Sequence, residues 1–279
     1  MANLPPLPRV TAMRYVQPLR EGGSLPAVVE TDDGLYVVKF RGAGQGPRAL
    51  VAELVVGLMA SLLELPVPAL ALVHLPPPFG RSEPDPEIQD VLRRSHGLNV
   101  GLRYLDGAFN FDCAAAADVV TPDFAARLVW LDALITNPDR THRNPNLLVW
   151  QRRPWLIDHG AALYAHHDWP QVTPEKVRSP FPLIENHVLL AHSARIEEAD
   201  ATLAAAMDDQ TIGALIEQVP DELLTGPEYT GDAGPGELRA RYRNYLGTRL
   251  RAPRPFLAGA VEARERRRLM PSLPQSARR

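Results

Sequence analysis

Short apolar runs separated by turn-forming residues fill the first hundred positions of the chain. Runs of this length, bounded by glycine, proline and aspartate, are typical of β-strands. We expect five strands, at residues 11–19, 26–30, 35–40, 67–75 and 97–105. The pair Asp33-Gly34, between the second and third runs, predicts a tight hairpin turn. The first part of the chain is therefore predicted to be rich in strands.

Helical spacing of apolar residues marks a first helix at 47–63 and prevails after residue 107. Thr121-Pro122-Asp123 is typical of a helix start, with a capping hydroxyl, a proline in the first turn and an acidic residue after it. Further helices are predicted at 86–95, 185–219 and 237–250. The pattern thus predicts an α+β fold in which Asp106-Gly107 links a β-rich part to a mostly helical part.

The main candidate chemistry lies in residues 137–160, which read NPDRTHRNPNLLVWQRRPWLIDHG. Two apolar runs within this segment, 147–150 and 155–157, predict a pair of strands. A turn at 151–154 would join them. Since paired strands bring their outer ends together, the polar residues on both sides of this hairpin are expected to lie close to one another.

Those polar residues are two carboxylates and two amides. Asp139, Asn144 and Asn146 precede the first strand, and Asp158 follows the second. Such a set suits phosphoryl transfer, in which one Asp accepts the proton of the attacking hydroxyl. The second Asp and an Asn can hold Mg²⁺, because this ion prefers oxygen ligands and bridges nucleotide phosphates. The ordered set favours a site, although each residue alone is also a common turn former.

Three charged residues lie within predicted strands and helices. Lys39 interrupts the strand at 35–40, and a lysine there is costly unless it is paired or binds an anion. Glu53 lies within the helix that follows this strand. Asp132 lies in the helix that leads to the polar loop, the segment that carries Asp139, Asn144 and Asn146. We expect Asp132 to be solvated or hydrogen bonded, with support of this loop as the alternative.

Composition excludes several classes of protein. The chain has 279 residues, of which 45% are hydrophobic and 23% charged, as in soluble globular proteins. A net charge of −3 gives no overall attraction to nucleic acid, so we expect no direct nucleic-acid binding. The single cysteine, Cys113, excludes a disulfide within the chain and fits a cytoplasmic protein. No apolar stretch approaches the ~18–20 residues that span a bilayer, so no membrane association is expected.

The segment 137–160 resembles the catalytic and metal-binding loops of the HipA-like kinases. More distantly it resembles those of phosphoinositide kinases, whose loop also begins Asp-Arg and whose metal motif is also Asp-x-Gly. The resemblance covers about residues 12–250 and implies a two-lobed protein-kinase-like fold. A nucleotide-binding lobe would comprise residues 1–106. A catalytic lobe with a basic tail would comprise residues 107–279, and we expect the tail, 264–279, to be solvated and partly disordered.

The resemblance also assigns roles to the polar loop. Asp139 corresponds to the catalytic Asp, and Asp158 to the metal-binding Asp of the Asp-Phe-Gly motif, with His159 in place of Phe. The metal-binding asparagine stays open between two residues. Asn144 has the usual spacing of five from the catalytic Asp, whereas Asn146 directly precedes the strand, as is usual for this ligand. We favour Asn146 slightly and retain both.

The nucleotide-binding residues follow from the same resemblance. Lys39 and Glu53 have the strand-then-helix order of the kinase ion pair that places a lysine on the α- and β-phosphates. A complete G-x-G-x-x-G loop is missing from the sequence. Two partial candidates could cover the phosphates, namely Gly22-Gly23-Ser24 and 42–46.

The resemblance implies an ATP- and Mg²⁺-dependent kinase. It would transfer the γ-phosphate to a hydroxyl, foremost a serine or threonine of a protein, with a small-molecule hydroxyl as the second choice. An antitoxin or another regulatory protein is the expected partner. Two alternatives remain. One is a pseudokinase that binds nucleotide without turnover, and the other is a metal hydrolase that uses His159, His166 and His167.

Overall fold

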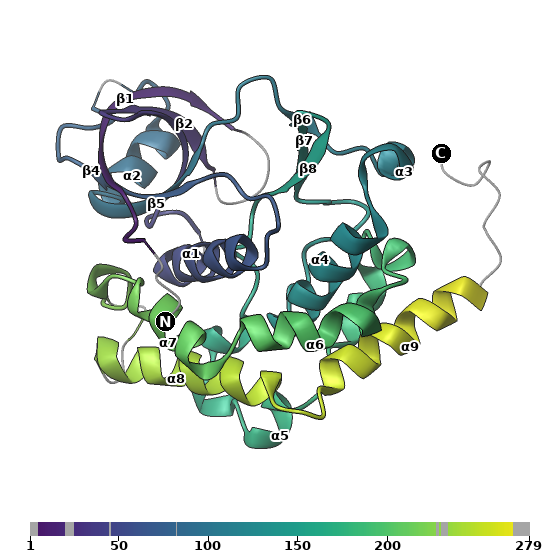
Figure 1. Ribbon diagram of the computed structural model, residues 1–279. Helices are drawn as coiled ribbons and strands as arrows, with labels where there is room; N and C mark the ends of the chain where they lie inside the picture. The colour runs from purple at the N-terminus through teal and green to yellow at the C-terminus, as the bar shows by residue number, and fades with distance from the viewer. Residues whose placement is uncertain are drawn as a thin grey trace.

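Five strands close into a barrel at the N-terminal end of the chain (Figure 1). The computed structural model describes residues 5–19, 25–44, 46–81, 83–226, 229 and 234–269. The barrel strands are β1 (Arg9–Pro18), β2 (Ala27–Thr31), β3 (Gly34–Lys39), β4 (Leu70–Leu75) and β5 (Gly97–Arg103). Their order is β1-β2-β3-β5-β4, and the parallel pairing of β1 with β4 closes the barrel.

Alternate residues of the barrel strands point inward and form a small separate core. Val10, Val29, Val38 and Val73 belong to it, each buried. The short helix α2 (Pro86–Arg94) closes this core with its own buried residues. All five predicted strands are confirmed, but β4 begins at Leu70 rather than at residue 67. Pro68 in this stretch lacks a backbone N–H that could join the ladder.

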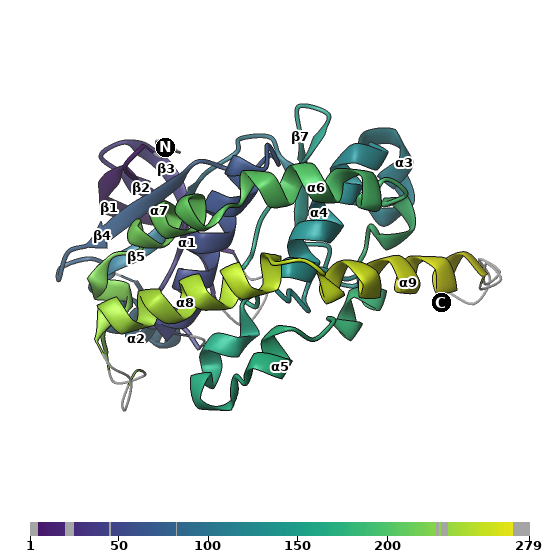
Figure 2. The ribbon, with the colours of Figure 1, turned by 60° about the horizontal axis from the view of Figure 1, so that its bottom comes forward.

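Helix α1 (Gly46–Leu62) is buried along most of its length. It is apolar on every side, and a helix with this pattern is stable only when it is enclosed. Strands β4 and β5 contact α1 on one side. Helix α7 (Asp209–Glu217) and the 3₁₀ turn η6 (Asp221–Leu223) contact it on the other (Figure 2). Glu53, near the middle of α1, is thereby enclosed by protein.

Helices make up most of the chain beyond residue 110. They are α3 (Ala116–Val119), α4 (Pro122–Leu134), α5 (Pro174–Val177), α6 (Ile196–Ala206), α7, α8 (Pro235–Leu250) and α9 (Pro255–Leu269). Short 3₁₀ turns connect them: η1 (Cys113–Ala115), η2 (Tyr164–His167), η3 (Trp169–Gln171), η4 (Pro182–Asn186), η5 (Leu190–His192) and η6. Helix α4 is central, since it packs against both α6 and α9. Its start is as predicted, because the Thr121 hydroxyl accepts a hydrogen bond from the backbone N–H of Phe124.

A second, three-stranded sheet carries the polar loop. It consists of β6 (Phe109–Asn110), β7 (Leu147–Trp150) and β8 (Arg153–Leu156). The predicted turn at 151–154 was too long. Gln151 and Arg152 alone connect the strands, both with positive φ, as a two-residue hairpin turn requires. Pro154 is tolerated because β8 pairs with a neighbour only on its β7 side.

Helix α9 corrects the expected disorder of the basic tail for residues 264–269. Phe256, Ala260 and Ala263 form a buried stripe at helical spacing. Arg264 is also buried, and its guanidinium donates to the carbonyls of Ser193 and Ala194. The prediction failed because the many arginines of this segment suggested a solvated tail, although apolar residues recur at helical spacing before them. The predicted helical pattern at 185–219 corresponds to η4, η5, α6 and α7. Within the described residues, none of the helices combines the length and apolar character needed to cross a membrane.

The packing of α9 on α4 predicts a large effect of Phe256. Its ring meets Trp130 edge to face, with centroids 5.6 Å apart. We expect Phe256→Ala to lower the free energy of unfolding by about 3–5 kcal/mol, since a large buried cavity remains. Phe109→Ala is the matched control, because Phe109 is 63% exposed. It should cost no more than about 0.5 kcal/mol in chemical denaturation. Equal losses for the two variants would show that α9 adds no packing energy.

Candidate active site

Lys39 brings the N-terminal barrel and the segment after β8 together. It is the last residue of β3 and is buried. Its Nζ lies 2.8 Å from Oε2 of Glu53 on α1, and it also forms an ion pair with Oδ1 of Asp158. Burial alone would lower the pKa of Lys39, but the two carboxylates outweigh this effect and raise it above its usual value. Lys39 therefore carries its positive charge at neutral pH.

One carboxylate oxygen of Glu53 accepts hydrogen bonds from two different segments of the chain. Its Oε2 accepts from Lys39 and, at 2.7 Å, from the backbone N–H of His159. Its Oε1 is buried and has no hydrogen-bond partner among the described residues. The glutamate thus connects α1 to β3 and to the residue that directly follows Asp158.

Asp158 faces Lys39 from an unusual backbone conformation, with φ of +55°. Non-glycine residues rarely adopt this region, and those that do cluster at functional sites. Burial alone would raise the pKa of Asp158, but the neighbouring Lys39 ammonium lowers it below its usual value. The side chain is consequently an ionised carboxylate.

Asp139 precedes the hairpin, on the loop before β7, and lies between two amides. Its Oδ2 accepts from Nδ2 of Asn144 at 2.9 Å and from Nδ2 of Asn146 at 3.1 Å. Asn144 is exposed, whereas Asn146 is buried and has φ of +48°. Both asparagines predicted as metal ligands therefore contact the predicted catalytic Asp, and each does so through Nδ2.

The fully buried ion pair of Arg140 and Asp132 joins this loop to helix α4. Arg140 donates from Nε to Oδ2 of Asp132 at 2.6 Å. His187 lies 2.9 Å from the same oxygen, and Asn137 donates to the other carboxylate oxygen at 3.0 Å. Burial alone would raise the pKa of Asp132, but Arg140, His187 and Asn137 outweigh it and hold the pKa far below its usual range. Asp132 is thus an ionised anchor of the loop, the supporting role that the sequence left as an alternative.

Arg140 also connects the two ends of the hairpin. Its Nη1 donates to the backbone carbonyl of Asn146, and its Nη2 lies 3.2 Å from Nδ1 of His159. His159 is completely buried, and burial is the main reason that its pKa falls to about 4. The ring is therefore neutral at pH 7. Neither Arg140 nor His187 was predicted from sequence. The detectable signal was Asp132, a carboxylate inside an apolar helix that needs a buried cation.

The three histidines of the alternative metal hydrolase do not form one site among the described residues. His166 and His167 belong to the 3₁₀ turn η2, where their Nε2 atoms lie 3.3 Å apart. His166 also contacts the hydroxyl of Tyr242, whereas His159 contacts Arg140. Across the described part of the chain, no three His, Cys, Asp or Glu side chains are grouped to hold a metal ion.

The two glycine-rich candidates have different outcomes. Gly22, Gly23 and Ser24 lie outside the described residues. In the second candidate, a side chain on Gly42 would come within 2.7 Å of the Arg94 Cβ. This glycine is therefore explained by its close approach to α2, independently of any phosphate.

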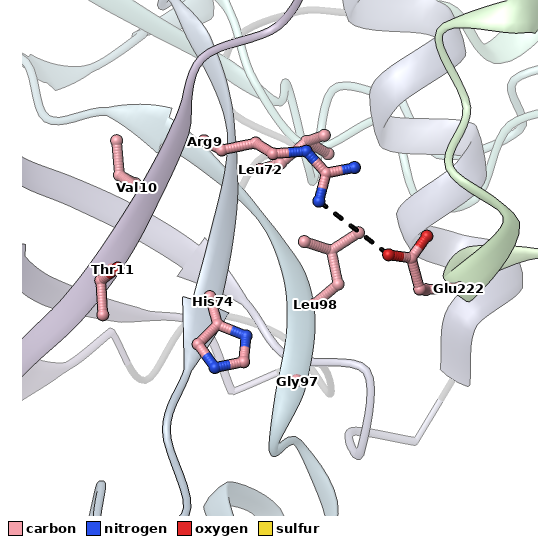
Figure 3. A pocket seen from close by; sticks show the side chains of 8 residues that line it. All are labelled: Arg9, Val10, Thr11, Leu72, His74, Gly97, Leu98 and Glu222. Carbon is pink, nitrogen blue, oxygen red and sulfur yellow. Dashed lines mark ion pairs between the residues drawn. The ribbon is translucent and has the colours of Figure 1, made fainter.

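One surface cavity lies away from these side chains (Figure 3). It has a volume of about 340 Å³ and lies where β1, β4 and β5 meet η6. Arg9 and Glu222 face each other across its rim at 3.9 Å. Its lining includes Leu72 and Leu98 but none of the candidate catalytic residues described above. The cavity is separate from the candidate active site.

A strand lysine paired with a helix glutamate, together with an Asp on a loop and an Asp after a hairpin, is typical of kinases. The family model for HipA-like kinases matches residues 13–232, and the chain belongs to this family. In the crystal structure of the Helicobacter pylori proinflammatory kinase CtkA, a chain of similar fold covers 95% of this chain and is itself covered completely. The TM-score is 0.53 and the sequence identity 14%, so this likeness concerns the fold alone. A search of curated proteins found no match.

The buried pair predicts a strong dependence of stability on Asp132. Asp132→Asn leaves Arg140 buried without its counter-charge, and we expect the free energy of unfolding to fall by about 3–5 kcal/mol. Asp123→Asn is the matched control on the same helix, because Asp123 pairs with Arg127 at the surface. It should cost no more than about 1 kcal/mol.

The difference between wild type and Asp132→Asn should also depend on pH. The folded pKa of Asp132 lies below that of the unfolded carboxyl, about 3.9, so the unfolded chain is protonated first as the pH falls. The difference should be constant above about pH 5 and shrink below about pH 4. Urea denaturation at several pH values measures it, and a difference that grows in acid would contradict the ionised state.

Proposed function

We propose that this chain is an ATP- and Mg²⁺-dependent kinase that transfers the γ-phosphate to a serine or threonine hydroxyl of a protein. The proposal rests chiefly on one observation. Arg140 connects the loop that carries Asp139 to the segment that carries Asp158, and Asp158 in turn pairs with Lys39. Asp139, Arg140, Asp158 and Lys39 thus belong to segments that hydrogen bonds and an ion pair join to one another. The proposed division into a nucleotide-binding lobe, 1–106, and a catalytic lobe, 107–279, accompanies this function.

The side chains suit Mg²⁺ and a nucleotide. Mg²⁺ prefers hard oxygen ligands, which the ionised Asp158 carboxylate and an asparagine amide oxygen supply. Asn146 is the preferred asparagine because its backbone carbonyl is fixed by Arg140. Asn144 remains the alternative. When bound, Mg²⁺ would neutralise phosphate charge.

Lys39 and Asp139 would act on opposite partners of the reaction. The Lys39 ammonium, which here pairs with Asp158 and Glu53, would bind the α- and β-phosphates. The Asp139 carboxylate would orient the acceptor hydroxyl and accept its proton while the γ-phosphate moves to the oxygen. Glu53 would keep Lys39 in place, because it is enclosed within α1.

The pseudokinase alternative receives less support from the residues. Asp139, whose proposed role lies in transfer and not in nucleotide binding, is retained and held between two amides. A protein is the preferred acceptor because of the resemblance to the HipA-like kinases, with a small-molecule hydroxyl as the second choice. An antitoxin or another regulatory protein is the proposed partner on the same ground.

Substitutions of Asp139 and Asp158 should have different effects on phosphoryl transfer and on Mg²⁺–ATP binding. Asp139→Asn should reduce phosphoryl transfer by about 10²- to 10⁴-fold yet bind Mg²⁺–ATP normally, because a base acts mainly in the transition state. Asp158→Asn should reduce transfer and also weaken Mg²⁺–ATP binding, because a metal ligand acts in both states. Single-turnover transfer and calorimetry should be measured on both variants. Unchanged transfer by Asp139→Asn would reject the catalytic role.

Metal dependence should separate the two asparagines. Asn146→Gly removes the amide yet tolerates φ of +48°, and it should raise the Mg²⁺ concentration for half-maximal transfer at least about tenfold. Asn144→Gly, the matched change on the exposed neighbour, should change it by less than about threefold. A Mg²⁺ titration of the transfer rate tests this difference. The reverse order would assign the ligand to Asn144, and two small effects would reject the loop assignment.

A further inference from the structure

His159, the residue directly after Asp158, contacts two other parts of the candidate active site, namely Arg140 and Glu53. Its ring Nδ1 faces Nη2 of Arg140 at 3.2 Å. Its backbone N–H donates to Oε2 of Glu53 at 2.7 Å. The residue therefore contacts the polar loop through its side chain and α1 through its main chain, while its covalent neighbour is the proposed metal ligand.

We propose that His159 is a positioning residue that holds the Asp158 carboxylate in place by accepting a hydrogen bond from Arg140. The inference rests on the proposed function, because it concerns the side chain assigned to the metal. His159 itself contacts neither metal nor nucleotide in this account. It acts through the backbone that it shares with Asp158.

Arg140 contacts two backbone segments, one at Asn146 and one at His159, and their conformations explain why a positioning residue is needed. Asp158 and Asn146 both have positive φ, of 55° and 48°. Strained conformations of this kind persist only where surrounding contacts determine them. Arg140 supplies one contact to each segment, from Nη1 to the Asn146 carbonyl and from Nη2 to the His159 ring. Because a guanidinium is planar and rigid, the two contacts fix the segments relative to each other.

The chemistry of the contact requires a histidine-like acceptor. An arginine guanidinium can only donate, so Nδ1 of His159 must accept and its ring proton must lie on Nε2. A phenylalanine at this position would fill a similar volume but offer no acceptor. Nη2 of the buried Arg140 would then lose a partner, and the Asp158 backbone would lose one of its two anchors.

Two variants of His159 separate the hydrogen bond from the volume. His159→Phe keeps a ring but removes the acceptor. His159→Asn loses volume but places its Oδ1 at the same number of bonds from the backbone as Nδ1. His166→Phe is the matched control, because His166 is equally buried but contacts Tyr242 and His167 instead of Arg140.

The measurement is calorimetric binding of a non-hydrolysable ATP analogue, with and without Mg²⁺, to the full chain. We expect His159→Phe to weaken binding of the Mg²⁺ complex about tenfold, a typical effect of removing the support of a metal ligand. Binding of the metal-free analogue should change by less than about twofold. His159→Asn should restore most of the loss, and His166→Phe should bind as wild type. At pH 7, ¹⁵N NMR of the wild type should show the His159 proton on Nε2.

Three results would overturn the proposal. One is a His159→Phe variant that binds the Mg²⁺ complex as wild type does. Another is an equal loss in His159→Phe and His159→Asn, which would make volume rather than the acceptor responsible. A ring proton on Nδ1 would contradict the hydrogen bond itself. A wild type that fails to bind the Mg²⁺ complex would instead reject the proposed function together with this role.

Discussion

The buried pair of Arg140 and Asp132 is the interaction on which the candidate active site depends. Two charges enclosed by protein are costly unless their hydrogen bonds are satisfied, and here His187 and Asn137 complete the Asp132 carboxylate. Only Nε of the Arg140 guanidinium donates to Asp132, so its other two nitrogens can contact Asn146 and His159. The central helix α4 thereby sets the position of both ends of the hairpin. Loss of Asp132 would consequently disturb groups that it does not touch.

The surroundings of α1 have a related consequence for the nucleotide side. The barrel covers one side of this helix, and α7 with η6 covers the other. Glu53 can therefore hardly leave its place without unpacking apolar surface, which makes its pairing with Lys39 part of the resting fold. Under the proposed function, Lys39 would bind phosphate while the packing of α1 is retained.

Local patterns were enough to predict the strands and the capped start of α4 at Thr121, whereas the pairing of Lys39 with Glu53 was implied by the resemblance to kinases. These features depend on residues close in sequence or on the order of elements. The cluster around Arg140 could not be predicted, because it joins α4, the polar loop and His187, directly after η4, through contacts that leave no periodic signal. The 3₁₀ turn that carries His166 and His167 was not predicted either, because a turn of this length leaves no periodic signal. The roles of the site residues remain predictions.

The most direct test of the account is transfer of phosphate to a hydroxyl. The full chain should be incubated with Mg²⁺ and γ-¹⁸O-labelled ATP in a dephosphorylated cell lysate, and phosphosites should be identified by mass spectrometry. The account predicts ¹⁸O-labelled phosphate on serine or threonine of a small set of proteins, present with the wild type and missing with Asp139→Asn. ATP binding without any labelled acceptor, or label that appears equally with both chains, would contradict it.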